Sequence, residues 1–388
     1  MDRFYLIPFV CLSEYLNRDE LLSLARTSLK NKKRFSSEAK TICKIQNIHE
    51  GTRLFNSYKK IRFSYTYRDE HWPEISFPKS SLVELTLVDL NLPITLLTEM
   101  TNLTRLRLAG NHYINFELAH IPNSLRKLEI HEWGIISSHI KNLTNLESLD
   151  IVANELIDDA GISNLTNLKS LSVPNNRLIS NAAIENLTLL ESLNIEGNCR
   201  WISNWGLRRL KNIESLNLDS NSDITWEGYS HLTKLSSLNM SYNNQASTLP
   251  KLPNLKILMA SFCVNLDERS LMNETNLTAL NISGTRLTGS CFKHLPNLTS
   301  LNIFYTKLSG EGLRYLTNLR KLFLGQQSGV CDEDIKYLIS LRELNLYSNK
   351  MITNDGIKHL TNLSILDRRE SLVTKDLIFY KRNWANGS

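Results

Sequence analysis

The chain has 388 residues and a formal net charge of +6, with 41% hydrophobic and 22% charged residues. This apolar fraction and small net charge exclude a disordered chain. The longest apolar run, Phe4 to Leu12, spans nine residues, about half of what a bilayer span requires, so we expect no membrane partner. Two residue types are unusually frequent, 67 Leu and 41 Asn, and this excess points to internal repeats.

The net charge is concentrated at the N-terminus. Residues 1–80 hold 15 Lys and Arg against 9 Asp and Glu, whereas residues 81–388 hold 30 of each. Clustered cations attract phosphates and are typical of nucleic-acid patches and nuclear localisation signals. We favour solvated helix ends, because no aromatic stacking pattern accompanies the cluster, and we expect no nucleic-acid partner.

The six cysteines are scattered, and no two of them form a CxxC pair. This spacing argues against a zinc site and a dense disulfide framework, so we expect no metal and no cofactor. Free thiols are typical of a reducing compartment, and the Met-Asp-Arg start lacks the features of a signal peptide. We therefore expect a cytoplasmic protein.

Residues 4–31 are predicted to form two helices. An apolar helix ends at Leu16, and the turn Asn17-Arg-Asp19 caps a second helix that carries several leucines. This stretch resembles an F-box, and the matching residues are Tyr15, Leu16, Asp19, Leu21, Leu24, Ala25 and Ser28. Phe4 and Tyr5 stand where that family has Leu-Pro, and Asn31 stands where it has Trp.

The resemblance implies an adaptor function. The helices would dock the Skp-type adaptor of a cullin-RING ubiquitin ligase through Leu12, Leu16, Leu21 and Leu24. A helical cap over the first repeat would carry similar leucines, so both interpretations stay open. We assign residues 1–50 to an F-box-like helical segment and residues 51–81 to a linker and N-terminal cap. Within residues 36–80 we expect a linking helix and then a leading strand over 60–65.

From residue 82 onward the chain repeats the pattern LxxLxLxxN. Clear copies include Leu146-Leu149-Ile151-Asn154 and Leu168-Leu171-Val173-Asn176. We call the first leucine of each copy its anchor and number positions from it. The fourteen anchors lie 20 to 23 residues apart, at residues 82, 103, 125, 146, 168, 190, 213, 235, 255, 277, 298, 319, 341 and 363.

This periodicity resembles the leucine-rich repeat family over residues 82–370. The resemblance implies an α/β leucine-rich-repeat solenoid, with parallel strands on the concave face, short helical turns on the convex face, and a small N-terminal helical head. Residues 371–388 are expected to form a C-terminal cap. The second and third apolar residues of each motif should point inward, and the Asn at position +8 should satisfy backbone groups at the bend. Cys263, Thr285 and Thr306 occupy that Asn position as substitutes.

Positions +2, +4 and +6 are expected to point outward on the concave face. Most of them are Ser or Asn, which we interpret as a solubilising floor. Near the start, Arg105 and Arg107 precede an acidic stretch, and we predict these two arginines as partner-binding residues. Towards the end, large apolar side chains are predicted as partner-binding residues on successive strands: Met259, Phe304, Phe323 and Tyr347. The alternative is that the C-terminal flank covers them or that they face the core.

Other features indicate neither catalysis nor a second site. Trp201, Trp205 and Trp226 fall in connecting segments, where we expect packing on the outer face. The chain has no GxGxxG, GxxxxGKS, HExxH or GxSxG motif, and its nine His are dispersed, so we expect no enzyme and no catalytic residue.

Three functional hypotheses follow. The first is a monomeric adaptor that recruits a target protein on its concave face to a ubiquitin ligase. The second is a plain leucine-rich-repeat scaffold or effector without a ubiquitin role. The third, an extracellular recognition protein of the internalin type, is disfavoured by the missing export signal and the free cysteines.

Overall fold

The computed structural model describes most of the repeat region. The described residues are 42–45, 60–64, 83–88, 97, 100–110, 121–131, 134–152, 154–197, 201–245, 247–326 and 328–374. The predicted adaptor-binding residues Leu12, Leu16, Leu21 and Leu24 lie outside these ranges, as does most of the predicted C-terminal cap. The chain divides into two compact units, residues 1–156 and 157–388.

The first unit is a ladder of parallel strands that pair in sequence order. The strands are β1 (Ile42–Ile45), β2 (Lys60–Ser64), β3 (Glu84–Val88), β4 (Arg105–Ala109), β5 (Lys127–His131) and β6 (Ser148–Val152), with helix α4 (Ser137–Ile140) before β6. The predicted leading strand over 60–65 corresponds to β2. Strand β1 was not predicted: it lies where we expected helical residues, and it pairs with β2 as one more rung of the same ladder.

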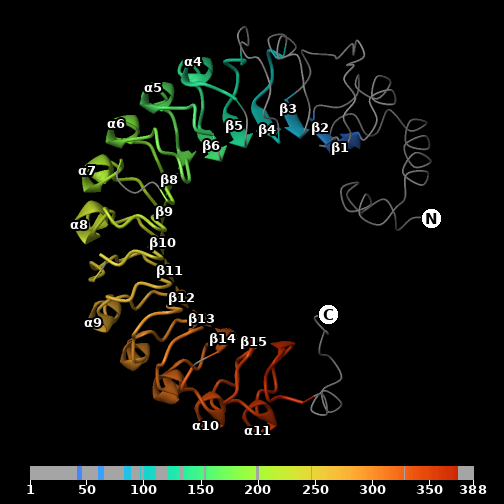
Figure 1. Cartoon of the computed structure of the whole chain (residues 1–388), viewed down its shortest axis with the longest axis vertical. Helices are drawn as coiled ribbons and strands as arrows, with labels where there is room; N and C mark the ends of the chain where they lie inside the picture. Colours follow the sequence, from blue (N-terminus) through green and yellow to red (C-terminus); the bar gives the residue numbers. More distant parts are fainter. Residues whose placement is uncertain are drawn as a thin grey trace, which may run out of the picture. The chain divides into compact units, whose positions relative to one another are not determined.

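The second unit continues this pattern with three-residue strands (Figure 1). The strands are β7 (Ser170–Ser172), β8 (Ser192–Asn194), β9 (Ser215–Asn217), β10 (Ser237–Asn239), β11 (Ile257–Met259), β12 (Ala279–Asn281), β13 (Ser300–Asn302), β14 (Lys321–Phe323), β15 (Glu343–Asn345) and β16 (Ile365–Asp367). They pair in parallel in sequence order, with equivalent positions opposite one another, for example Leu238 and Leu216.

Short helical turns connect these strands along the outer edge of the unit (Figure 1). They are α5 (Asp159–Ile162), α6 (Asn181–Ile184), α7 (Asn204–Leu207), α8 (Trp226–Tyr229), α9 (Glu268–Leu271), η4 (Ser290–His294), η5 (Gly310–Tyr315), α10 (Asp332–Ile335) and α11 (Asn354–Ile357). The predicted arrangement of parallel strands on one face and helical turns on the other is confirmed.

The core lies between the two layers. In a typical repeat the anchor Leu168, Leu171 and Val173 are buried, whereas Ser170 and Ser172 are partly exposed. Each buried leucine contributes about 1.5–3 kcal/mol to the stability of the fold. Because each repeat buries its leucines against its neighbours, a single repeat is not stable without adjacent repeats.

The asparagines at position +8 form the predicted ladder. Asn243 is buried, and its Nδ2 donates to the carbonyls of Asn221 and Ile224 at 2.9 and 3.0 Å. Cys263 occupies the same position, and its Sγ donates to the carbonyl of Met240. Thr285 and Thr306 each donate to the carbonyl three residues earlier. The prediction that these three residues replace asparagine is confirmed.

One repeat departs from the pattern. Between β10 and β11 the described residues form no helix. In the preceding repeat the N–H of Leu232 donates to the carbonyl of Tyr229 at the end of α8. Here the equivalent Leu252 N–H donates instead to the carboxylate of Glu274 at 3.0 Å, and Glu274 is only 2% exposed. The Glu274 carboxylate therefore replaces the acceptor that the missing helix would have supplied.

Candidate functional site

The strand ends in the second unit are held by asparagine side chains at position +4. Each Oδ1 accepts the backbone N–H of the residue two positions later, which turns the chain out of the strand. This contact is made by Asn194, Asn217, Asn239, Asn281, Asn302 and Asn345 at 2.9–3.1 Å. The Asn column was interpreted as a solubilising floor, but its amides also shape the turns that carry the candidate site.

These turns correct one prediction about the concave face. Because strands β7–β16 contain only positions +2 to +4, position +6 lies in the turn and not on the strand. Met259 and Phe323 lie on β11 and β14, whereas Phe304 and Tyr347 follow β13 and β15. The expectation that these four side chains lie on successive strands is therefore wrong. Two of them lie on strands and two lie in the turns that follow strands.

Position +7 adopts the left-handed conformation in nine of the ten repeats of the second unit; in the tenth, Gly325 at position +6 has the positive φ in place of Gln326. The nine residues at position +7, with φ between 55° and 70°, are Asn175, Gly197, Ser220, Tyr242, Phe262, Gly284, Tyr305, Ser348 and Glu370. Glycine and asparagine suit this conformation, whereas a bulky side chain costs about 1–2 kcal/mol. Tyr242, Phe262 and Tyr305 therefore bear a cost that a smaller residue would avoid, and such strain is typical of functional positions.

The aromatic side chains pack along the direction of the repeats. The rings of Tyr242 and Phe262 stack with centroids 4.9 Å apart and an interplanar angle of 14°. The Phe262 ring lies over Gly284, where a Cβ atom would overlap it, and the Phe304 ring lies over Gly325 in the same way. Phe304 and Tyr305 are tilted against each other with centroids 5.8 Å apart.

We call Tyr242, Met259, Phe262, Phe304 and Tyr305 the aromatic edge. Tyr242 is 53% exposed, Tyr305 46%, Met259 37% and Phe262 36%, and Phe304 is half-buried. The strands beneath them, β10–β13, contain no charged residue, and neither do positions +6 and +7 of the same repeats. The aromatic edge is thus an uncharged surface of large apolar side chains held in fixed turns.

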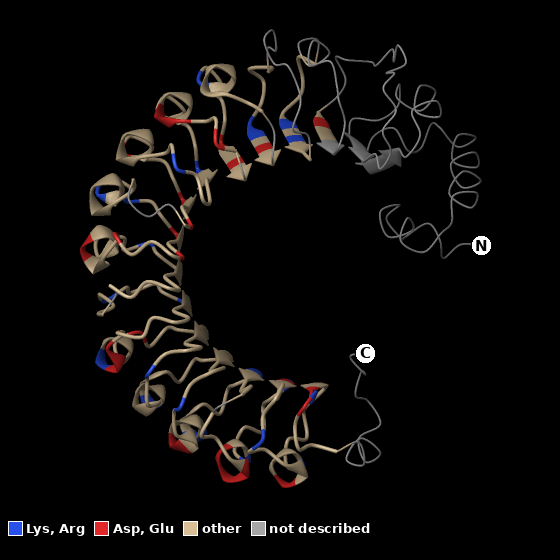
Figure 2. Cartoon of the chain, in the orientation of Figure 1, with Lys and Arg blue, Asp and Glu red and all other residues tan. Residues whose placement is uncertain are grey.

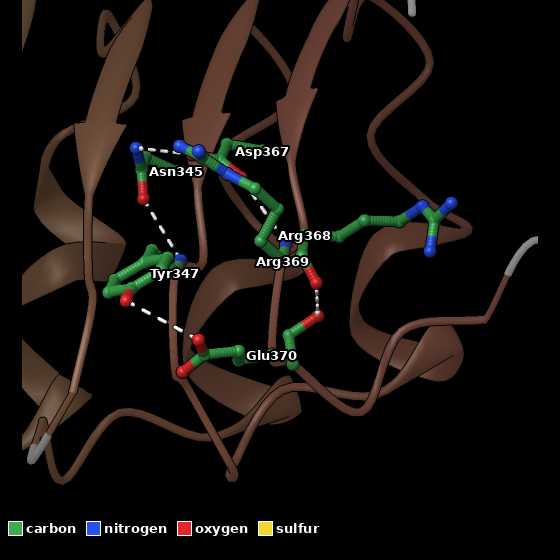
Figure 3. Close-up of polar contacts among 7 residues, drawn as sticks. Asn345, Tyr347, Asp367, Arg368, Arg369 and Glu370 are labelled. Carbon is green, nitrogen blue, oxygen red and sulfur yellow. Dashed lines mark hydrogen bonds and ion pairs between the residues drawn. The ribbon is translucent and has the colours of Figure 1, made fainter. Parts of the chain in front are cut away.

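Tyr347 lies in a different environment, a polar cluster at the end of the repeats (Figure 3). Its hydroxyl donates to Glu370 at 3.4 Å, and the Arg369 guanidinium lies 5.5 Å from its ring centroid. Arg369 donates two hydrogen bonds to Asp367, at 2.7 and 2.9 Å, and these bonds lower the pKa of the Asp367 carboxyl. Asn345 Nδ2 also donates to Asp367, at 3.2 Å.

The predicted cationic residues Arg105 and Arg107 lie in the first unit, on strand β4. The Nη1 atoms of Arg105 and Arg107 lie 3.9 and 3.5 Å from the carboxylates of Glu84 and Glu129 on the neighbouring strands. Lys127 also contacts Glu129, at 2.7 Å. Figure 2 shows these alternating charges across β3–β6. The two arginines therefore belong to an ion-pair network and do not form an isolated cationic patch.

Reasoning from the sequence missed Tyr242, Phe262 and Tyr305. Only positions +2, +4 and +6 were considered as outward-facing, and these three residues occupy +7. The available signal was the contrast within that column, where aromatic residues replace the Asn, Gly and Ser of other repeats. The left-handed backbone that makes this contrast meaningful is visible only in the structure.

The described residues offer little for catalysis. They contain no group of three or more His, Cys, Asp or Glu side chains that could hold a metal ion. Burial raises the pKa of the Cys263 thiol to about 11 and also raises the pKa of Cys291, so both thiols are poor nucleophiles at neutral pH. Among the helices that the structure describes, none is long and apolar enough to cross a bilayer.

Comparison with known proteins agrees with this architecture. A leucine-rich-repeat family model matches residues 142–166, 294–316 and 337–364. A leucine-rich-repeat protein of Leptospira interrogans has a similar structure, with a TM-score of 0.64 and 20% identity over 88% of this chain and 97% of the other. No curated protein sequence matches the chain.

Two further solved structures share the fold. An internalin of Listeria monocytogenes is similar with a TM-score of 0.51 and 22% identity, over 74% of this chain and 87% of the other. A chain of the Toll–Spätzle complex of Drosophila is similar with a TM-score of 0.55 and 19% identity, over 86% of this chain and 54% of the other. The protein is therefore built of leucine-rich repeats in a leucine-rich-repeat solenoid fold.

Proposed function

We propose that the protein is a non-enzymatic scaffold that captures a protein partner on the aromatic edge. The observation that carries this proposal is the presence of three exposed aromatic side chains on left-handed residues. Each ring is kept at a position where asparagine or glycine would be less strained, and this supports a role in addition to packing within the chain. Large aromatic side chains in a rigid frame are the usual hot spots of protein interfaces.

The physical setting also suits protein binding. Asn239 and Asn302 hold the turns that carry Tyr242 and Tyr305, and the Phe262 ring stacks on Tyr242, so little motion of these side chains is lost on binding. The solved structures with the same fold support this use, since one of them is a chain of the Toll–Spätzle complex. The bacterial relatives fit a scaffold without a ubiquitin role.

The test replaces Tyr242, Phe262 and Tyr305 together by Asn, the residue that occupies the equivalent position at Asn175. Because Asn tolerates a left-handed conformation, the variant should unfold at a temperature close to that of the wild type. Its capture of partner proteins from a lysate should fall by more than about tenfold. The matched control changes Tyr315 and Tyr337, which are equally exposed on outer turns, to Asn. Equal capture by all three proteins would refute the proposal.

Two further residues that the sequence predicts as partner-binding, Phe323 and Tyr347, lie outside the aromatic edge and are tested separately. Phe323→Ala with Tyr347→Ala should weaken capture while leaving thermal unfolding nearly unchanged. A large loss of stability would mean that the two rings serve the fold. Arg105 and Arg107 are proposed as a secondary contact only, because each already faces a carboxylate.

A second candidate function rests on the F-box-like order of residues 12–28. In this proposal the protein is a cytosolic monomer, and Leu12, Leu16, Leu21 and Leu24 bind a Skp-type adaptor. A pull-down with that adaptor should succeed with the wild type and fail with the Leu16→Asp, Leu21→Asp double variant. If both proteins bind equally, or neither binds, the plain scaffold is the better account.

A further inference from the structure

A second unusual surface lies on the helical side of the second unit. Trp201, which precedes α7, is 53% exposed, and Trp205 within α7 is 56% exposed. Trp226, the first residue of the neighbouring α8, is 41% exposed. The three rings lie in the outer connecting segments, as expected, and about half of each residue remains exposed there. Exposed tryptophans gathered on adjacent repeats are typical of interaction sites.

Cations accompany these rings. The Arg208 guanidinium lies 3.2 Å from the centroid of the Trp205 ring, in a cation–π contact, and 3.7 Å from the carboxylate of Glu185. The next residue, Arg209, donates to the amide oxygen of Asn186 at 2.9 Å. Lys234, one repeat later, likewise donates to an amide oxygen, that of Asn212, at 2.8 Å. Two of these three cations thus contact neutral carboxamides, which leave their charge uncompensated.

Arg208, Arg209 and Glu185 also line a shallow hollow of about 660 Å³. Its lining residues are Glu185, Thr188, Arg208, Arg209 and Lys211. Three cations against one carboxylate give the lining a net charge of +2 (3 − 1). In Figure 2 the turn of the α7 repeat carries the blue of Lys and Arg, whereas the neighbouring α8 carries red. A positive hollow beside an exposed apolar ring is complementary to a ligand that is both acidic and apolar.

We propose that this surface binds an acidic segment of a protein partner. Carboxylates of the segment would contact Arg209 and Lys211 in the hollow, and an apolar side chain would cover Trp201 and Trp205. The cation–π contact fixes the Arg208 plane before binding, which reduces the entropy lost when its remaining N–H groups meet a carboxylate. This surface lies on the helical side of the repeats and does not include any residue of the aromatic edge.

The test is a selection of random twelve-residue peptides displayed on phage against the full-length wild-type protein. Enriched peptides should be rich in Asp and Glu and carry at least one aromatic or leucine residue. They should bind the Arg209→Glu, Lys211→Glu variant and the Trp205→Ala variant at least about tenfold more weakly than the wild type. A neutral Arg209→Gln, Lys211→Gln variant should lose binding to a smaller extent, and it replaces the charge-reversed variant if that one fails to fold.

Two controls separate this site from the rest of the molecule. The pair Arg314 and Tyr315 on η5 makes a similar contact, with the guanidinium 5.3 Å from the ring centroid, and its double Ala variant should bind the peptides normally. The triple Asn variant of the aromatic edge should also bind normally. The proposal is wrong if the enriched peptides are not acidic or bind the charge-reversed variant equally. Self-association of the wild type that charge reversal abolishes would assign the surface to a second copy and overturn it.

Discussion

At the scale of single residues, the excess of asparagine reflects three structural roles. At position +8 the buried amide bonds to two repeats: Asn243 donates to the carbonyls of Asn221 and Ile224 in the preceding repeat and accepts the Gln245 N–H of its own. At +4 the side chain holds the turn after the strand, as Asn302 does for Phe304. Immediately before the anchor, an exposed Asn donates to a carbonyl of the preceding repeat, as Asn297 does to Thr275 at 3.0 Å. Only the first role was predicted, because the other two depend on turn geometry that a repeat pattern does not specify.

The asparagines at position +8 and those before the anchor should contribute differently to the free energy of unfolding. Asn243→Ala would leave the buried carbonyls of Asn221 and Ile224 without their side-chain donor and should lower the free energy of unfolding by about 2–4 kcal/mol. Asn297→Ala removes a solvent-exposed hydrogen bond and should cost about 0.5–1 kcal/mol. Urea unfolding measures both. Equal losses for the two variants would contradict the distinction between the two columns.

At Tyr229, by contrast, we expect a substitution to raise the free energy of unfolding. Tyr229 is fully buried at the end of α8, and its hydroxyl makes no hydrogen bond with any residue that the structure describes. Burial of this unpaired hydroxyl costs about 1–3 kcal/mol. Tyr229→Phe keeps the ring and removes the oxygen, so it should raise the free energy of unfolding by about 1 kcal/mol. A destabilised Phe variant would mean that the hydroxyl has a partner in the native protein.

At the scale of elements, the repeat pattern predicted the parallel strands, the outer helical turns and the inward leucines. It could do so because burial of leucine at fixed spacing determines all three. It did not predict the missing helix between β10 and β11, or that Glu274 would be buried there. A glutamate in a column of leucines is explained only by the Leu252 N–H that has lost its helical acceptor. Met259 and Phe304 of the aromatic edge were predicted, but Tyr242, Phe262 and Tyr305 were not, because their exposure depends on left-handed turns.

Glu274 should make stability depend on pH. Burial raises the pKa of its carboxyl above the ordinary value of 4.5, although the Leu252 N–H and Lys251 act in the opposite direction. A carboxyl with a raised folded pKa stabilises the fold below its unfolded pKa and loses this contribution as the pH rises through the folded value. Glu274→Gln keeps the acceptor without the charge.

The measurement compares the urea midpoints of the wild type and Glu274→Gln at pH 4 and pH 7. The Gln variant should gain stability relative to the wild type on going from pH 4 to pH 7. If the midpoints of the two proteins differ by the same amount at both pH values, the Glu274 carboxyl has the same pKa in the folded and unfolded protein, and the prediction is wrong.

At the scale of the whole molecule, the two units carry different kinds of surface. The strands of the first unit bear ion pairs, such as Lys127 with Glu129, and the strands β10–β13 of the second unit bear no charge. The net charge of +6 belongs to residues 1–80. A partner of the aromatic edge is therefore held mainly by apolar contact. A ligand of the outer surface around Trp205, Arg209 and Lys211 is held partly by charge.

Salt should separate the two binding modes. In 0.5 M NaCl the screening length falls to about 4 Å, so exposed charge contacts weaken while apolar contacts persist. Capture by the aromatic edge should be nearly unchanged between 0.1 and 0.5 M NaCl, and binding of acidic peptides at the outer surface should fall several-fold. The titration of both ligands on one protein preparation provides the comparison. Equal salt dependence would contradict the assignment of the two surfaces.

The central claim is that the aromatic edge is the surface on which this scaffold holds its partner. Hydrogen–deuterium exchange of the protein with and without a captured partner tests it most directly. The account predicts added protection in the turns after β10, β11 and β13, at residues 241–243, 261–263 and 304–306, and none on the outer turns α9 to α11. Protection confined to the outer turns, with those three segments unchanged, would contradict it.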